Sequence, residues 1–290
     1  MTTDHAAMTA WAERFARATA TVLPQAGDLA WLLRQSVHTH FQRLALLPVF
    51  GLTQAPLRVL DVGAGTGAMC LDLAWATGGA ARLTAIDHDA HGLALLRDMA
   101  GQLGCSIETR QGDAYALPAA PGSQDLTLCR FLFQHLERPA DALREMIRVT
   151  APGGRVAVMD VDDGAWISCP DEAPEMQRLN DAVRALQASR GAGRLVGRRL
   201  YGLFRAAGLA EVQVLAVPRV RLGTSYGRSA EVEAHQKDFY LNQRGRLIAA
   251  GLIDAEGFDA AMRALEASFA RDEFGFACEF IAFGRVAAAG

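Results

Sequence analysis

The fold is decided by one nine-residue stretch, Val59-Leu60-Asp61-Val62-Gly63-Ala64-Gly65-Thr66-Gly67. It begins inside an apolar run of the kind that forms a buried parallel strand, and glycine then occupies every second position. Glycines at a turn let the backbone approach a ligand closely, and the N-terminus of a following helix offers free N–H groups. We therefore expect a strand, a ligand-binding loop and a helix, in that order.

Strand-like and helix-like segments alternate around this stretch. We expect strands at 57–62, 82–86, 106–110, 126–130 and 155–161, with helices at 66–76, 90–103 and 140–149. Such alternation predicts a parallel sheet with helices on both faces. Two later strands are expected at 211–217 and 275–286, the last without a crossover helix before it. The predicted fold class is therefore α/β, a Rossmann-like, doubly wound, mostly parallel seven-stranded sheet with an antiparallel last strand.

Other segments are helical in pattern and divide the chain into four parts. Helices are expected at 11–22, 29–47, 172–207, 229–250 and 255–270. We interpret residues 1–50 as an N-terminal helical lid, 51–161 as the ligand-binding core and 162–200 as a helical insertion over the active site. Residues 201–290 then supply the rest of the core, with inserted helices and the final strand.

Three aspartates follow the carboxyl ends of neighbouring strands. Asp61 precedes Gly63 by two residues, Asp87 follows the second strand and Asp113 follows the third. With Ala68 the loop also matches the dinucleotide fingerprint G-x-G-x-x-A. A carboxylate at Asp61 would repel a pyrophosphate but attract a cation, whereas Asp87 suits the ribose of either ligand. The alternative for each aspartate is a helix cap or a turn.

These residues resemble the class I methyltransferases that use S-adenosylmethionine (SAM). Asp61 and the three glycines stand in that family's D-x-G-x-G-x-G motif, and the resemblance covers about residues 57–161. It implies SAM as the cofactor and methyl transfer to a small organic molecule. The cofactor would be held by Asp61, Gly63, Ala64, Gly65, Thr66, Gly67, Asp87, His88, Gly112, Asp113, Ala114 and Arg130.

Two of the candidate residues have a role in the chemistry. His135, just past the fourth strand, is the candidate general base, because its ordinary pKa suits proton transfer; the alternative is a structural residue of the next helix. Arg130 would pair with the methionine carboxylate of SAM, or with a nearby acidic side chain.

Weaker candidates have an ordinary structural interpretation that we favour. Three aspartates after the fifth strand could orient a cationic amine, but a solvated turn is the preferred interpretation: Asp160, Asp162 and Asp163. Two histidines and four aromatic residues could face the acceptor, but packing or surface roles are preferred: His38, His40, Trp31, Trp166, Phe239 and Tyr240.

The composition limits the kinds of binding partner that we expect. The net charge of −3 gives no sign of binding along nucleic acid, and the apolar stretch 44–52 is too short to span a membrane. The five cysteines are scattered without a Cys-x-x-Cys motif, so we expect no metal site and a cytoplasmic location. The expected partner is a small-molecule acceptor, with no nucleic acid and no membrane, and the expected state is a monomer or a homodimer.

Several functions stay open. Oxygen, nitrogen and carbon are all possible acceptor atoms, and the lid-like segments resemble those of enzymes that tailor natural products, by analogy alone. The main alternative is a nicotinamide-dependent oxidoreductase, which would use the glycine loop and Asp87 but would leave Asp61 and Asp113 without a role. A non-catalytic protein of the SAM fold and an enzyme that uses SAM without methyl transfer, such as a cyclase, are further alternatives.

Overall fold

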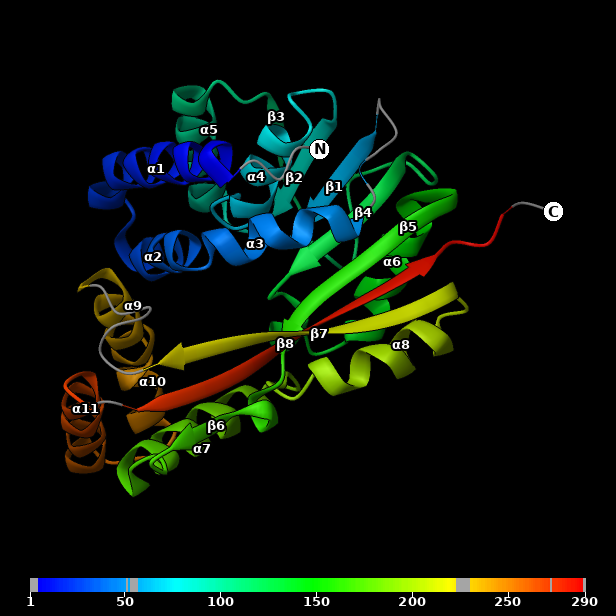
Figure 1. Ribbon diagram of the computed structural model, residues 1–290. Helices are drawn as coiled ribbons and strands as arrows, with labels where there is room; N and C mark the ends of the chain where they lie inside the picture. Colours follow the sequence, from blue (N-terminus) through cyan, green and yellow to red (C-terminus); the bar gives the residue numbers. More distant parts are fainter. Residues whose placement is uncertain (1–4, 51, 53–56, 223–229, 272, 289–290) are drawn as a thin grey trace.

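The computed structural model describes residues 5–50, 52, 57–222, 230–271 and 273–288. In these residues eight strands form one sheet in the order β3-β2-β1-β4-β5-β8-β6, with β7 on the free side of β8 (Figure 1). The strands are β1 (Arg58–Val62), β2 (Arg82–Asp87), β3 (Ile107–Gln111), β4 (Gln124–Arg130), β5 (Thr150–Val161), β6 (Ile167–Cys169), β7 (Ala210–Leu222) and β8 (Phe274–Arg285). Neighbours among β1 to β5 run parallel, whereas β8 is antiparallel to β5, β6 and β7.

The chain turns in opposite directions on the two sides of β1. From β1 it passes through α4 (Ala68–Ala76) and α5 (Ala90–Leu103) to β2 and β3, and it then returns to β4 on the other side. Helices α6 (Pro139–Val149) and α8 (Leu200–Ala206) cover the opposite face, where they pack in a second core. In open sheets of this kind, ligands bind beyond the carboxyl ends of the strands at such a reversal. The predicted fold class is confirmed, with β6 as an additional short strand.

Three predicted helices are interrupted in the structure. Segment 29–47 divides at Thr39 into α2 (Ala30–His38) and α3 (His40–Leu46). Segment 172–207 comprises α7 (Pro174–Ala188) and α8, separated by a stretch in which Gly191 has φ of +74°. Segment 229–250 is α9 (Ala230–Leu241) and α10 (Arg244–Ala249), whereas α11 (Ala255–Phe269) agrees with its prediction. Apolar spacing continues through each break, so periodicity alone does not reveal it.

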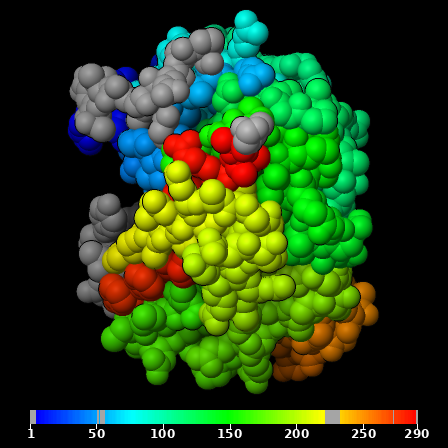
Figure 2. Space-filling view, turned by 90° about the vertical axis from the view of Figure 1, so that its right-hand side faces the viewer, coloured from blue at the N-terminus to red at the C-terminus, as the bar shows by residue number. Residues whose placement is uncertain are grey.

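The two last long strands extend beyond the rest of the sheet. β7 continues five residues past the predicted end at 217, through Pro218, and it pairs with β8 alone. A proline is tolerated there because β7 is an edge strand whose outer side needs no partner. Figure 2 shows this part of the chain, in yellow, at the molecular surface. The far ends of β7 and β8 reach toward α9, α10 and α11 (Figure 1).

The N-terminal helices share the main core with the sheet. α1 (His5–Val22) contributes Trp11, whose indole N–H donates to the Asp72 carboxylate of α4 at 2.9 Å. Arg43 of α3 donates to the other oxygen of Asp72 at 2.7 Å, and both charged side chains are fully buried. A buried ion pair therefore attaches the N-terminal helices to the layer that carries the glycine loop. No helix in the described ranges is both long and apolar enough to cross a membrane.

We expect Asp72→Ala to lower the free energy of unfolding by about 3–5 kcal/mol, because it leaves the buried Arg43 guanidinium without its carboxylate. The measurement is urea unfolding followed by circular dichroism. Asp98→Ala, at an exposed position of α5, is the matched control and should stay within about 0.5 kcal/mol of wild type. Equal losses in the two variants would show that the ion pair does not secure these helices.

Candidate functional site

The loop between β1 and α4 follows a path that favours glycine. Its three glycines have left-handed φ values: 68° at Gly63, 54° at Gly65 and 77° at Gly67. A leucine from another element packs against each, so that an added Cβ would lie 2.9 Å from Leu132, 2.9 Å from Leu32 and 2.1 Å from Leu96, respectively. Gly67 stands before α4 without any side-chain cap, which leaves first-turn N–H groups for other acceptors. The loop is thus a backbone cradle at a helix N-terminus.

Asp87 joins this cradle to the end of β2. One carboxylate oxygen accepts the Gly65 N–H at 2.7 Å, and the other accepts the Asp89 N–H at 2.9 Å. The ring of His88 is exposed and its Nδ1 lies 3.1 Å from Asp87 Oδ1. Asp87 stands at the end of β2, and only 7% of it is exposed. The two backbone N–H donors fix the orientation of its carboxylate. A carboxylate held in this way can accept further hydrogen bonds from a ligand.

Asp61 lies below the loop and is 2% exposed. Both the thiol and the backbone N–H of Cys70, in the first turn of α4, donate to its carboxylate. Burial raises the pKa of Asp61 to about 7, with a further increase from Asp87 and an opposing effect of Arg130. Asp61 is therefore a buried carboxyl that changes charge near neutral pH.

The other predicted loop residues lie around this cradle. Thr66 is buried, and Ala64 donates its N–H to the Ile86 carbonyl at 3.0 Å. Gly112 donates to the Asp87 carbonyl at 2.9 Å, which ties the end of β3 to the end of β2. Asp113 is exposed and accepts the Tyr115 N–H at 2.9 Å in a local turn, and Ala114 packs against the second core.

Arg130 has a buried glutamate as its partner. Its guanidinium lies 3.4 Å from Glu279 Oε2 on β8 and stacks on the ring of Phe131 at 3.8 Å. The other oxygen of Glu279 makes no hydrogen bond and lies 3.9 Å from Arg219 on β7. Burial lowers the pKa of Arg130 to about 10, so the side chain stays charged. One glutamate thus faces two arginines.

His135 stands just after β4, where its ring reaches solvent. Enough protein surrounds the ring that desolvation lowers its pKa to about 4, and Arg194, Arg246 and His88 add to this effect. The imidazole is therefore neutral at physiological pH, but its pKa lies well below the ordinary value on which the prediction of a general base rested. The post-β4 segment that carries it begins at Phe131, which has a strained φ of 59° for a bulky residue.

Asp160 lies in β5, and Asp162 and Asp163 follow its end. The three aspartates do not form a solvated turn, and that interpretation was wrong. Asp160 is fully buried and accepts the N–H groups of Val161 and Gln134, so it holds the segment that carries His135. Burial raises the pKa of Asp160 to about 7. Asp162 pairs with Arg198, and Asp163 pairs with Arg194.

Helices α2 and α9 pack against each other, and Leu32 of α2 packs against Gly65 of the glycine loop; we call this helix pair the cap. Arg34 of α2 pairs with Asp238 of α9 at 3.0 Å, and His235 Nδ1 lies 3.1 Å from the Trp31 carbonyl. The ring of Trp31 faces two rings of α9, at 6.3 Å from His235 and 6.3 Å from Phe239. Of the remaining weak candidates, four are placed as follows: His38 near His235, His40 in the core beside Asp72, Tyr240 bonded to Asn180, and Trp166 partly exposed.

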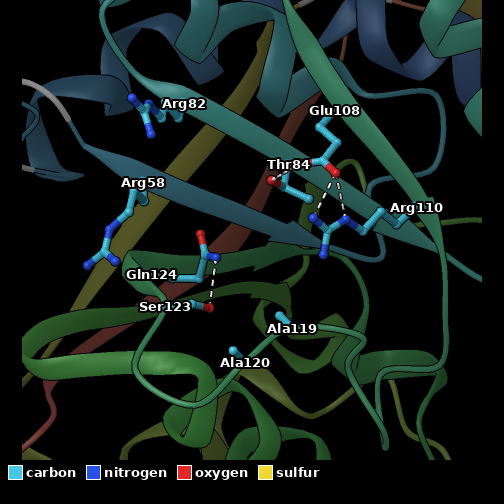
Figure 3. Close-up of a pocket in the computed structure, with 9 residues that line it drawn as sticks. All are labelled: Arg58, Arg82, Thr84, Glu108, Arg110, Ala119, Ala120, Ser123 and Gln124. Atoms are coloured by element: carbon cyan, nitrogen blue, oxygen red, sulfur yellow. Dashed lines mark hydrogen bonds and ion pairs between the residues drawn. The ribbon is translucent and has the colours of Figure 1, made fainter.

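A separate cavity of about 280 Å³ lies at the opposite end of the strands (Figure 3). Its lining includes the first residues of β1, β2 and β4, namely Arg58, Arg82 and Gln124. Glu108 and Arg110, two residues apart on β3, pair with each other in its wall. Because the glycine loop is at the carboxyl end of β1, this cavity is not part of the candidate site.

Four residues near the carboxyl edge were not predicted from the sequence: Arg194, Arg219, Arg246 and His235. They come from segments far from the glycine loop in sequence. His235 belongs to the cap, and the three arginines influence the pKa of a histidine near that edge. No local motif marks them. Only the pairing of β7 with β8 and the packing of α9 on α2 bring these segments to the site.

Known proteins resemble this chain in sequence and in fold. Residues 59–154 match the family model described as a methyltransferase domain. An uncharacterized 37.1 kDa protein in transposon TN4556 of Streptomyces fradiae is 30% identical over 68% of this chain and 54% of its own length. The demethylmenaquinone methyltransferase of Deinococcus radiodurans is 32% identical over 49% of this chain and 57% of its own length.

A solved structure agrees with the fold. The YcgJ protein of Bacillus subtilis superposes with a TM-score of 0.55 at 21% identity, covering 87% of this chain and 100% of that one. The chain spans about half the length of the curated relatives it matches. The matched family model includes the glycine loop, Asp87 and Asp113. Residues 59–154 therefore form a domain of the methyltransferase family, and the fold around this domain agrees with that assignment.

Proposed function

We propose that this protein transfers the methyl group of SAM to a small organic molecule. The observation that carries the proposal is the glycine cradle with Asp87 fixed beside it at the carboxyl edge of the sheet. The relative from D. radiodurans is named a demethylmenaquinone methyltransferase, which supports a small-molecule acceptor. We extend the proposal to a place in natural-product biosynthesis, with oxygen, nitrogen or carbon as the acceptor atom.

The residues at the cradle fit SAM. The glycines permit close approach of a ligand, and Asp87 can accept hydrogen bonds from ribose hydroxyls. Asp61, Asp87 and Asp113 supply no positive charge for a pyrophosphate, which disfavours a nicotinamide dinucleotide. When bound, SAM supplies an electrophilic methyl carbon whose leaving group is a neutral thioether. The protein then has to orient the acceptor, exclude water and receive any proton that the acceptor loses.

His135 is the residue we assign to the proton. Its ring is neutral because its pKa is lowered to about 4, so Nδ1 or Nε2 can accept a hydrogen bond from an acceptor O–H or N–H. Asp160 holds the backbone of the neighbouring Gln134 at 3.1 Å and thereby fixes the segment. Arg194 supports the same segment, because it donates to the Gln134 side chain at 2.7 Å.

Calorimetry with SAM, its demethylated product and NAD tests the cofactor. We expect binding of the first two and none of NAD. Asp87→Ala should weaken binding roughly tenfold to a hundredfold, because ribose hydroxyls lose a charged acceptor. Asp98→Asn is the control, and thermal melting checks that both variants fold. NAD binding without SAM binding would favour the oxidoreductase, and an unchanged affinity in Asp87→Ala would remove Asp87 from the site.

SAM affinity should depend on pH through Asp61. Burial raises the pKa of Asp61 to about 7, so the group gains negative charge as pH rises through neutrality, and that charge favours a sulfonium and an ammonium. We expect the dissociation constant to rise several-fold, up to roughly tenfold per unit, as pH falls below 7. In Asp61→Asn this dependence should flatten. A wild-type affinity that is constant over this interval would contradict a role for the charge of Asp61.

His135→Ala should reduce turnover more than affinity. We expect a decrease in kcat of roughly a hundredfold or more if the residue receives the acceptor's proton, with SAM affinity nearly unchanged. The assay follows methyl transfer from labelled SAM to an acceptor identified from a compound library. His5→Ala, at an exposed position of α1, is the control. Turnover at the wild-type level in His135→Ala would assign the residue a structural role, and cofactor binding without turnover of any compound would favour a non-catalytic protein.

A further inference from the structure

The proposed methyl transfer leaves the chemical class of the acceptor open. The charged side chains around the cap favour some classes of acceptor over others. We propose that the acceptor is a planar phenol or enol that binds as its oxyanion between the α2–α9 cap and the segment carrying His135. This inference rests on the proposed function, which it deepens. The inference is argued from two arginines whose positive charge is not fully neutralised and from a group of planar side chains.

Arg219 supplies the first excess positive charge. It lies on β7, with 41% of its side chain exposed, and within the described residues it pairs only with Glu279, at 3.9 Å. Arg130 shares that glutamate at the shorter distance of 3.4 Å. One carboxylate therefore faces two guanidinium groups, and Arg219 is the one that reaches solvent. Its charge lowers the pKa values of both His38 and His235 at the cap, in addition to the effect of burial.

Arg246 supplies the second excess charge, from α10. Among the residues that the structure describes, no carboxylate lies within ion-pair distance of it, and its guanidinium donates a hydrogen bond to the Asn242 carbonyl at 3.4 Å. Its charge contributes to the lowered pKa of His135, so the field at the predicted base is positive. An anionic ligand gains from such a field, whereas a cationic one would be repelled.

Three aspartates around the cap and the His135 segment are already engaged. Asp163 pairs with Arg194, and Asp238 pairs with Arg34. Asp160 is fully buried and faces backbone N–H groups. A cationic amine would therefore find no free carboxylate among these three aspartates, so we favour an acidic acceptor over an amine.

Planar side chains gather at the cap. The rings of Trp31 and His235 are nearly parallel, with an angle of 19°, and Phe239 stands at 67° to Trp31. The Arg194 guanidinium lies 5.5 Å above the ring of Phe239, so a positive charge accompanies this aromatic surface. All four side chains are partly exposed. Aromatic faces and guanidinium planes favour a planar partner with delocalised charge.

Binding as an oxyanion also prepares the acceptor for reaction. A positive field lowers the pKa of a bound hydroxyl, whose proton leaves through neutral His135 to solvent. The acceptor's electron pair then forms the bond to the methyl carbon, and the electron pair of the broken sulfur–carbon bond stays on sulfur. An anion and a cation thus become two neutral products, and the enzyme needs no strong base.

The test uses 4-nitrophenol as a probe, because its ionised form has its own absorption band. At a pH where the free probe is mostly neutral, addition of protein loaded with demethylated cofactor should increase the phenolate band in a saturable way. Arg219→Met and Arg246→Met should each weaken phenolate binding roughly tenfold, since each removes a charged partner. Arg263→Met, at an exposed position of α11, is the matched control and should behave as wild type.

Two results would overturn the inference: no saturable increase of the phenolate band, or an increase that both arginine variants retain in full. Calorimetry with the demethylated cofactor on the same samples separates this failure from that of the proposed function. Cofactor binding without the phenolate signal contradicts only the acceptor class, and loss of cofactor binding contradicts the methyltransferase itself. Melting temperatures of the variants exclude unfolding as the cause.

Discussion

The fold and the candidate site both depend on three glycines with a left-handed backbone conformation. Gly63, Gly65 and Gly67 let the chain leave β1 and enter α4 along a path that side chains would strain. At each glycine a leucine from a different element packs against the backbone, and these come from the segment after β4, from α2 and from α5. The loop is therefore both the expected cofactor cradle and the place where the sheet, the cap and the first helical layer meet. A side chain at any of the three would disturb all of them together.

The parts of the fold that follow from local chemistry were predictable. Strands β1, β2, β4 and β5 each bury an apolar run, whereas β3 is mostly exposed and follows from its place in the alternation of strands and helices. The helix breaks were not predictable, since apolar residues keep their spacing through Thr39 and the chain turns there to bring Arg43 onto Asp72. β6 has three residues and exists only because β8 extends far enough to pair with it. Both depend on contacts between residues distant in sequence.

The residues of the candidate site also divide into those that could be predicted from the sequence and those that could not. The glycine loop and Asp87 were predictable because the residue types and their spacing at strand ends carry the chemistry. The exact placement of Asp61 was not, because its bond to Cys70 depends on how α4 docks. Arg130 illustrates the limit: its partner Glu279 lies 149 residues away, and only the antiparallel pairing of β8 with β5 places it there. The roles of these residues toward a ligand stay predictions.

A row of charged side chains links the glycine loop to the cap. Strand register puts Asp61, Arg130, Glu279 and Arg219 on the same face of the sheet, and their charges alternate in sign from β1 to β7. Charges in a poorly solvated layer interact more strongly than they would in water, and Arg130 feels both Glu279 and Arg219. The row begins beneath the glycine loop and ends at Arg219 beside the cap. Arg130 interacts with Asp61 at one end of the row and with Glu279 and Arg219 at the other, so it links the glycine loop electrostatically to the cap.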